Sequence, residues 1–400
     1  MRVVRIAPMA AALLCAACIT VPREAGPPPA PADAVPVGFA PQIRSNSNDR
    51  SITEDLPGTL QRLRSASDGT LDILALSGGG AGGAYGAGAL VGLSDANRLP
   101  KFEIVTGVST GALIAPFAFL GPQWNTQLEQ AYTGPRAERL LRNRGLMILF
   151  RPGIFSGDPL TQLVDEFTTQ ALVDAVARES RRGRLLLVAT TNLDTQDPII
   201  WNMGKIAESG GDAARRMFRD ILVASASVPG VFPPIMVNVD TDHGHSQEMH
   251  VDGGVTSSFF VMPQIVSMWG GETMRELRGG NIYVIINGQL DNRLSATPLN
   301  TVPIVSRSFE TNQMFQARAQ LALTTEFAQR NHLDLKFARI SRDYPYLGPL
   351  EFEHVAMREL FDFGRRQAVE GHLWSTPEDF VEQLSEPAQG PNEEESQAVR

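Results

Sequence analysis

The sequence predicts an α/β fold, with a mainly parallel central sheet between layers of helices. One observation is a series of short, continuous apolar runs, which are typical of parallel strands covered on both faces. These runs are residues 71–76, 102–106, 185–189 and 282–286. A second observation is that helical segments alternate with the runs. The composition, with 43% hydrophobic and 20% charged residues, is that of a globular protein with a full core.

Five further segments indicate helices. They are residues 83–93, 110–120, 158–177, 212–225 and 302–329. Asp158 and Pro159 form a suitable cap and first-turn pair for the third of these helices. Pro116 predicts a kink in the second. We expect residues 70–290 to form the main domain and residues 291–385 to form a mixed α/β C-terminal extension.

The N-terminus indicates export. A short positive region is followed by an apolar stretch at residues 6–17, which is too short to span a bilayer. Small residues then precede Cys18 in a pattern that resembles the lipobox of bacterial lipoproteins, although Cys15 stands where leucine is usual. We expect a signal peptide over residues 1–18, with lipidation of Cys18 favoured over plain cleavage. Such an anchor would tether the protein to a membrane surface, in a periplasmic or outer-membrane location.

Two segments lack the composition of a folded core. Residues 19–50 are rich in proline, which predicts an extended linker, and residues 386–400 are polar and acidic, which predicts a disordered tail. Both cysteines lie within the first eighteen residues. The folded body therefore has neither a disulfide nor a cysteine metal site.

The overall charge argues against a nucleic-acid partner. The net charge is −9 and the pI is near 5.3, whereas phosphate binding needs concentrated Lys and Arg. The basic run at Arg181, Arg182 and Arg184 indicates a solvated turn before a strand. We expect neither a metal nor another cofactor.

A possible nucleophile lies between a predicted strand and a predicted helix. Residues 107–111 follow the pattern G-x-S-x-G with Ser109 at its centre. A serine on such a tight turn projects its hydroxyl outward, and Gly107 and Gly111 remove side chains that would clash. The N-terminus of the following helix favours developing negative charge. The pattern therefore makes Ser109 a candidate nucleophile.

A glycine-rich loop at residues 77–83 also joins a strand to a helix. Consecutive glycines expose backbone N–H groups that can converge on an anion. One function is an oxyanion hole for acyl transfer. The other is dinucleotide binding, because Gly78, Gly80 and Gly83 fit G-x-G-x-x-G, with Glu103 about twenty residues further on. The second function leaves the turn at Ser109 unexplained.

A third glycine motif, Asp252-Gly253-Gly254, follows an alternating segment. By itself this motif is usually a turn. Together with the glycine loop and the serine turn, in this order, it resembles the patatin-like phospholipases. Residues 224–234, which include Phe232-Pro233-Pro234, look like a further block of the same family.

This resemblance implies a three-layer α/β/α fold and a Ser–Asp dyad. Ser109 would be the nucleophile and Asp252 its base, with Gly78, Gly79 and Gly80 stabilising the oxyanion. The substrate would be a phospholipid, a lysophospholipid or a related lipid ester, and acyl transfer to another acceptor would use the same dyad. Many members of the family carry Arg or Lys where this chain has Gly82, so the role of that cation would be vacant or filled from elsewhere.

The sequence also permits other functions. His332, His354 and His372 follow Asp252, so chain order permits a Ser–acid–His triad, although none of them has a recognisable flanking motif. The histidines around Asp242 suggest a metal site or, more simply, the tip of a hairpin. These are His243, His245 and His250. Beyond these, the chain could be a nucleotide-binding oxidoreductase or a catalytically silent envelope scaffold.

Two segments are candidates for shaping a substrate site. Residues 191–194 end a predicted strand, where the loops of α/β folds gather around an active site. Residues 147–155 form an apolar segment broken by Pro152 and Gly153, which indicates a lid or lipid-facing wall, or equally a buried helix end.

Overall fold

The computed structural model describes residues 34–46, 56–67, 69–134, 158–242, 244–261, 279–292 and 296–379. The predicted signal peptide with Cys18, most of the linker, the apolar segment 147–155, His243 and the tail 386–400 lie outside these residues. Within them, no helix combines the length and the apolar character that crossing a bilayer would require.

A ten-stranded sheet runs through the described part of the chain. Eight of its strands follow the order β1-β7-β8-β5-β4-β3-β9-β10, while β6 also pairs with β5, and β2 pairs with β6. The strands from β5 to β10 in this order are parallel. They are β5 (Leu185–Asn192), β4 (Ile104–Val108), β3 (Asp72–Leu76), β9 (Asn281–Ile286) and β10 (Asp334–Arg339). The predicted parallel centre is thus confirmed, and all four predicted apolar runs form its strands.

Antiparallel strands extend the sheet on one side. They are β8 (Gly244–Asp252), β7 (Ile235–Thr241), β1 (Val35–Pro36), β6 (Asp197–Asn202) and β2 (Arg44–Asn46). β7 and β8 form a hairpin in which Thr241 pairs with Gly244. The hairpin tip predicted around Asp242 is therefore confirmed.

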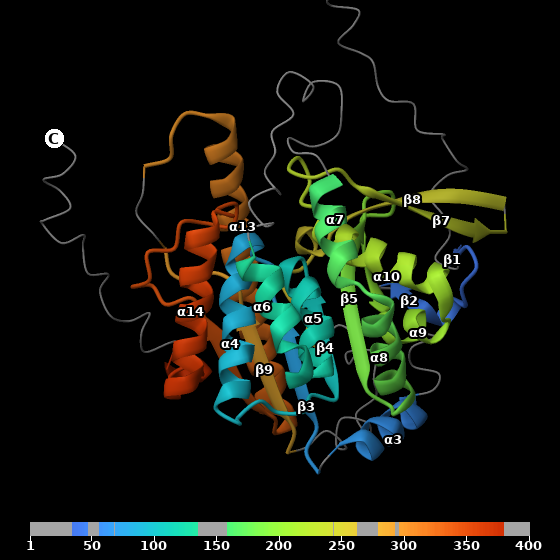
Figure 1. The fold of residues 1–400 in the computed structure, drawn as a ribbon, viewed down its shortest axis with the longest axis horizontal. Coiled ribbons are helices and arrows are strands. Elements are labelled where there is room, and N and C mark those ends of the chain that lie inside the picture. The colour runs from blue at the N-terminus through green and yellow to red at the C-terminus, as the bar shows by residue number, and fades with distance from the viewer. Residues whose placement is uncertain are drawn as a thin grey trace, which may run out of the picture.

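Helices cover both faces of the parallel strands, as Figure 1 shows. The described helices are α3 (Leu56–Ala66), α4 (Gly83–Asp95), α5 (Thr110–Leu120), α6 (Asn125–Thr133), α7 (Asp158–Phe167), α8 (Gln170–Arg181), α9 (Met203–Glu208), α10 (Gly211–Ser225), α13 (Thr301–Asn331) and α14 (His354–Glu370). Alternate β3 residues belong to two separate cores, Leu74 and Leu76 to one, Ile73 and Ala75 to the other. The first core includes α4, α5, α10 and α14, and the second includes α3 and α13. This is the predicted three-layer arrangement.

The C-terminal extension contributes to the same layers. β10 pairs with β9, and α14 packs closely against α4 (Figure 1). Gly88 and Gly92 make this approach possible, because a Cβ at position 88 would lie 1.9 Å from the carbonyl oxygen of Phe361. The boundary near residue 290 stays a prediction.

One predicted helix is in fact two. The segment predicted over residues 158–177 breaks after Phe167, and α8 begins at Gln170. Thr169 has extended backbone angles, and its side chain accepts a hydrogen bond from the Leu172 N–H, which makes it an N-cap. The second predicted helix, α5, is continuous through Pro116.

Candidate active site

Ser109 lies on a strained turn between β4 and α5. Its φ of 56° and ψ of −127° are rare for a residue with a side chain. The flanking glycines allow the turn, because a Cβ at Gly107 would lie 2.6 Å from the Gly111 carbonyl oxygen. A Cβ at Gly111 would lie 2.3 Å from the carbonyl oxygen of Leu76. The local geometry is therefore the one that the G-x-S-x-G spacing predicts.

The structure brings Ser109 and Asp252 together. The Ser109 hydroxyl donates a hydrogen bond of 2.6 Å to Oδ2 of Asp252. Asp252 ends β8, and the pairing of Thr190 with Asp252 places that end beside the carboxyl ends of the parallel strands. Gly253 is needed there, because a Cβ would lie 2.5 Å from the Ala189 carbonyl oxygen. The Asp-Gly-Gly motif is thus a site of close backbone approach.

The Asp252 carboxyl group has the properties of a base near neutral pH. Burial raises its pKa from 3.8 to about 7, and the hydrogen bonds from Ser109 and from the Gly254 N–H partly oppose this rise. The Gly254 N–H donates to Oδ1 at 2.6 Å, which leaves Oδ2 directed at the serine. A base is most effective when its pKa lies near the working pH.

Two serines of the segment 224–234 hold these groups in place. The Ser225 hydroxyl accepts from the Ser109 N–H at 3.0 Å and donates to the Ala189 carbonyl at 2.7 Å. The Ser227 carbonyl accepts from the Asp252 N–H at 3.0 Å. The sequence pattern identified this segment, but only the tertiary contacts reveal its positioning role.

The three glycines predicted for the oxyanion hole are not equivalent. The Gly78 N–H donates to the Ser258 carbonyl at 2.9 Å and is therefore unavailable, which corrects the prediction for this residue. Within the described residues, the N–H groups of Gly79 and Gly80 have no acceptor. Both have positive φ, at 152° and 56°, and their neighbours leave no room for side chains. Gly79 and Gly80 thus remain as the candidate donors.

Gly82 occupies a position with no space for a cationic side chain. A Cβ there would lie 2.1 Å from the Asn287 carbonyl oxygen and 2.8 Å from the Tyr346 hydroxyl. That hydroxyl donates to the Gly79 carbonyl at 3.3 Å. Tyr346 and Asn287 therefore pack against the loop where many relatives carry Arg or Lys, and Tyr346 also binds its backbone.

The dinucleotide-binding alternative is wrong in its geometry. Glu103 is buried at the start of β4 and accepts a hydrogen bond from the Asp72 N–H at 2.8 Å. Asp72 begins β3, whereas the glycine loop follows its end, so the length of this five-residue strand separates the two groups. That length is roughly 16 Å at about 3.3 Å per residue. Glu103 therefore lies at the wrong edge of the sheet to bind a ribose.

The described histidines do not complete a triad. His354 donates to the Thr133 carbonyl at 2.6 Å, and His332 is the C-cap that follows α13. His372 is exposed and lies near Glu370. His250, two residues before Asp252, is buried between Thr190 and Glu248. None of these described histidines hydrogen-bonds to Ser109 or Asp252.

The alternative of a histidine metal site finds no support in the described part of the chain. His245 is exposed and pairs with Asp240 on β7, whereas His250 is buried, so these two side chains do not converge. No group of three or more potential metal ligands occurs among the residues that the structure describes.

Residues 191–194 support β8 and do not line the main cavity. The Thr191 hydroxyl donates to the Asp252 carbonyl at 3.1 Å. Oδ2 of Asp194 accepts from the Met249 N–H at 2.9 Å. The expectation that this segment lies near the active site is met, but its described contacts are structural.

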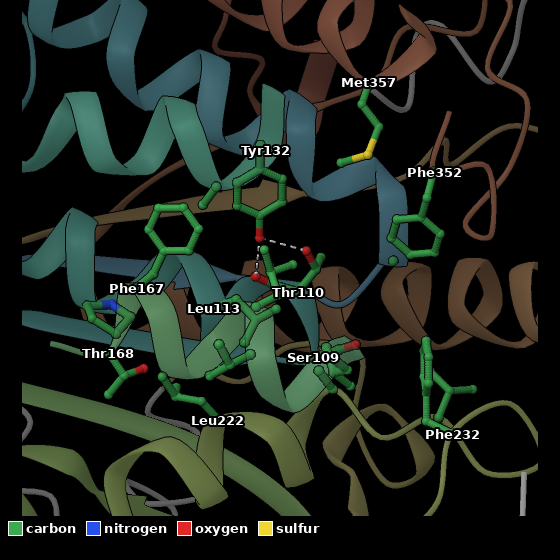
Figure 2. Close-up of a pocket in the computed structure, with 18 of the residues that line it drawn as sticks. Ser109, Thr110, Leu113, Tyr132, Phe167, Thr168, Leu222, Phe232, Phe352 and Met357 are labelled. Atoms are coloured by element: carbon green, nitrogen blue, oxygen red, sulfur yellow. Dashed lines mark hydrogen bonds between the residues drawn. The ribbon is translucent and has the colours of Figure 1, made fainter. Parts of the chain in front are cut away.

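An apolar cavity opens beside Ser109, and the space within it and its open mouth together is about 930 Å³. Figure 2 shows Ser109 and Thr110 at this cavity, with aromatic and aliphatic side chains around it. The lining comes mainly from α5, α6, α7, α10 and the segment before α14, and it includes Leu113, Tyr132, Val164, Phe167, Leu222, Phe232, Phe309, Phe352 and Met357. The Tyr132 hydroxyl is hydrogen-bonded to Thr110, so it adds little hydrogen-bonding capacity to the cavity wall. Such a cavity suits a long hydrocarbon chain.

A comparison with models of protein families agrees with this arrangement. Residues 74–264 match the family model described as patatin-like phospholipase. Among solved structures, the chain is similar to VipD from Legionella pneumophila, with 12% identity and a TM-score of 0.37 over 76% of this chain and 67% of VipD. No curated protein matched the chain. The family match begins within β3 and extends beyond the end of β8, and it therefore includes Ser109, Asp252 and the glycine loop.

Proposed function

From the premise that residues 74–264 form a patatin-like phospholipase domain, and hence a lipid acyl hydrolase, we propose that the chain is a serine esterase that uses a Ser109–Asp252 dyad. The observation that carries this proposal is the 2.6 Å contact between these side chains beside the apolar cavity. The nucleophile, its base and a place for an acyl chain therefore lie together.

The acylation step follows from this geometry. Ser109 Oγ attacks the ester carbonyl carbon while its proton passes to Oδ2 of Asp252. The carbonyl oxygen becomes an oxyanion that accepts from the N–H groups of Gly79 and Gly80. When the ester C–O bond breaks, the alcohol leaves with the proton from Asp252. The products of this step are an acyl-Ser109 and a free alcohol.

Deacylation uses the same groups in the reverse order. Asp252 removes a proton from a water molecule, and the resulting hydroxide attacks the acyl carbon. Ser109 Oγ then leaves and regains its proton from Asp252. Because serine and aspartic acid have very different intrinsic pKa values, much of the rate must come from the oxyanion donors, each worth about 10²–10³ in rate. The raised pKa of Asp252 narrows that difference.

We propose a lipid ester as the substrate class, either a phospholipid, a lysophospholipid or a related ester, on the strength of the family match and the cavity. An acyl chain in the cavity would be surrounded by the apolar side chains that Figure 2 shows around it. The predicted lipid at Cys18 would hold the domain at an envelope membrane, where such esters are found.

Labelling with a fluorophosphonate probe tests the proposal. We expect the full chain to be labelled and Ser109→Ala not to be labelled. A scaffold protein would show no labelling. Labelling that persists in Ser109→Ala would assign the nucleophile elsewhere.

A further inference from the structure

A second cavity borders the glycine loop, and its lining includes Gly78 and Gly79. The space within it and its open mouth together is about 400 Å³. Phe309 on α13 lines both this cavity and the apolar cavity, which contains Gly80 and Ser109. The two cavities therefore meet at the loop that carries the candidate oxyanion donors.

Gln313 brings this second cavity close to the dyad. A Cβ at Gly78 would lie 3.1 Å from Ser109 Cβ and 3.3 Å from Gln313 Oε1, so only this glycine separates the two side chains. On the other side, a Cβ at Gly254 would lie 2.5 Å from Gln313 Nε2 and 2.9 Å from Asp252 Oδ1. Gln313 thus lies beside both members of the dyad.

The amide of Gln313 presents an oxygen without a partner. Its Nε2 donates to the Gly254 carbonyl at 3.0 Å, which fixes the orientation of the amide. Its Oε1 is buried and has no hydrogen-bond partner among the described residues, and the same holds for the hydroxyl of Ser258, which is 1% exposed. Both residues line the second cavity. Unsatisfied buried polar atoms are costly, so these two are suited to a ligand that hydrogen-bonds to them.

The chemistry of these atoms limits what the ligand can be. Gln313 Oε1 is an acceptor and needs a donor, which a hydroxyl group supplies and a phosphate ionised at neutral pH supplies poorly. None of the described lining residues is Lys or Arg, and the one carboxylate, Glu310, is paired with Arg307 at 2.9 Å. An anionic group would therefore be buried there without a cation to balance it.

We propose that the second cavity binds the alcohol part of the ester and prefers an uncharged, hydroxyl-bearing group, such as a glycerol, to an anionic one. The inference rests on the proposed function, because it requires an acyl chain in the apolar cavity and the ester carbonyl at Ser109. The leaving alcohol then extends past Gly78 toward Gln313 and Ser258. Within the broader class of lipid esters, this makes monoacylglycerol a better substrate than lysophosphatidic acid.

The experiment compares monolauroylglycerol with lauroyl lysophosphatidic acid, using the full chain and dispersions matched in concentration. We expect wild type to have a kcat/KM at least about tenfold higher for the glyceride. Gln313→Leu should reduce this ratio about three- to tenfold, the worth of one hydrogen bond. Gln313→Leu also removes the hydrogen bond to the Gly254 carbonyl, but that loss acts on both substrates. The ratio of the two kcat/KM values therefore reports the contact with the alcohol.

Two further variants distinguish loss of the alcohol contact from a general folding defect. Ser258→Ala keeps the carbonyl that accepts from Gly78 and should also lower the ratio. Gln316→Leu, the same change one turn away on α13 and outside both cavity linings, should leave the ratio as in wild type.

A control ester distinguishes failure of the alcohol site from failure of the proposed hydrolase function. If wild type and Ser109→Ala are equally inactive on p-nitrophenyl laurate, the hydrolase itself is wrong. If wild type hydrolyses that ester in a Ser109-dependent way but shows no preference for the glyceride, the alcohol site is wrong. The same conclusion follows if neither Gln313→Leu nor Ser258→Ala changes the ratio.

Discussion

The hydroxyl of Ser109 donates a 2.6 Å hydrogen bond to the carboxylate of Asp252, a residue 143 positions further along the chain. Two backbone features create this contact. The strained turn after β4 projects Ser109 outward, and the pairing of β8 with β5 brings Asp252 to the same edge of the sheet. Both groups are buried, at 2% and 0% exposure, so the pair is shielded from bulk water.

Replacing Asp252, the proposed base, should have opposite effects on activity and on stability. Asp252→Asn should lower kcat about 10²–10⁴-fold, because the amide cannot take the serine proton. The variant should also be more stable than wild type at pH 8. The folded pKa of about 7 lies above the unfolded value of 3.8, so the folded state of wild type loses stability as pH rises through this window. The loss, up to about 4 kcal/mol, is complete above pH 7.

Thermal unfolding at several pH values checks this prediction. The Tm advantage of Asp252→Asn should be largest at pH 8 and should shrink as the pH falls toward 4. An advantage that is independent of pH, or a variant less stable than wild type at pH 8, would show that the carboxylate is not held in an unfavourable buried state.

The pH dependence of turnover should report the same group. Asp252 must be ionised to accept a proton, so kcat/KM should rise with pH and level off above an apparent pKa of about 7. Below that value the rate should fall about tenfold per pH unit. A profile measured with a soluble p-nitrophenyl ester that stays flat from pH 5 to 8 would argue against this base.

Ser225 should act as a positioning residue. Ser225→Ala leaves the Ser109 N–H and the Ala189 carbonyl without their shared partner. We expect kcat to fall about tenfold or more, with little change in KM, since the change displaces the nucleophile and not the acyl chain. The matched control is Ser227→Ala, whose hydroxyl binds only the Val223 carbonyl, one turn back in α10. Equal losses of kcat in the two variants would contradict a specific positioning role for Ser225.

The apolar cavity should set acyl-chain length. Leu222→Trp places a larger side chain in the cavity wall, and excluding two methylene groups costs about 1.6 kcal/mol, or roughly tenfold in kcat/KM. Dodecanoyl esters should therefore lose activity while acetyl esters keep it. Leu193→Trp, at a 39% exposed position outside the cavity lining, is the control. A uniform loss across all chain lengths would contradict an acyl-binding role.

The parts of the site that are local in sequence were predictable. Ser109 follows from glycine spacing on a strand-to-helix turn, and the parallel strands follow from continuous apolar runs. Asp252 required the resemblance to a family, because Asp-Gly-Gly alone indicates a turn and its pairing with β5 is non-local.

Other features depend on tertiary contacts that no local pattern encodes. The Gly78 N–H is already bonded to Ser258, so only two of the three predicted donors remain. Gly82 is small because Asn287 and Tyr346, from beyond the matched domain, pack against it. The break between α7 and α8 was missed because a single cap at Thr169 outweighs a continuous helical pattern.

The most direct test of the dyad is to trap the acyl-enzyme. The full chain is mixed with p-nitrophenyl laurate, quenched with acid during turnover and digested for mass spectrometry. We expect a lauroyl group on Ser109, and no adduct in Ser109→Ala. A lauroyl group on another residue, or turnover that continues in Ser109→Ala, would contradict the assignment of Ser109 as the nucleophile.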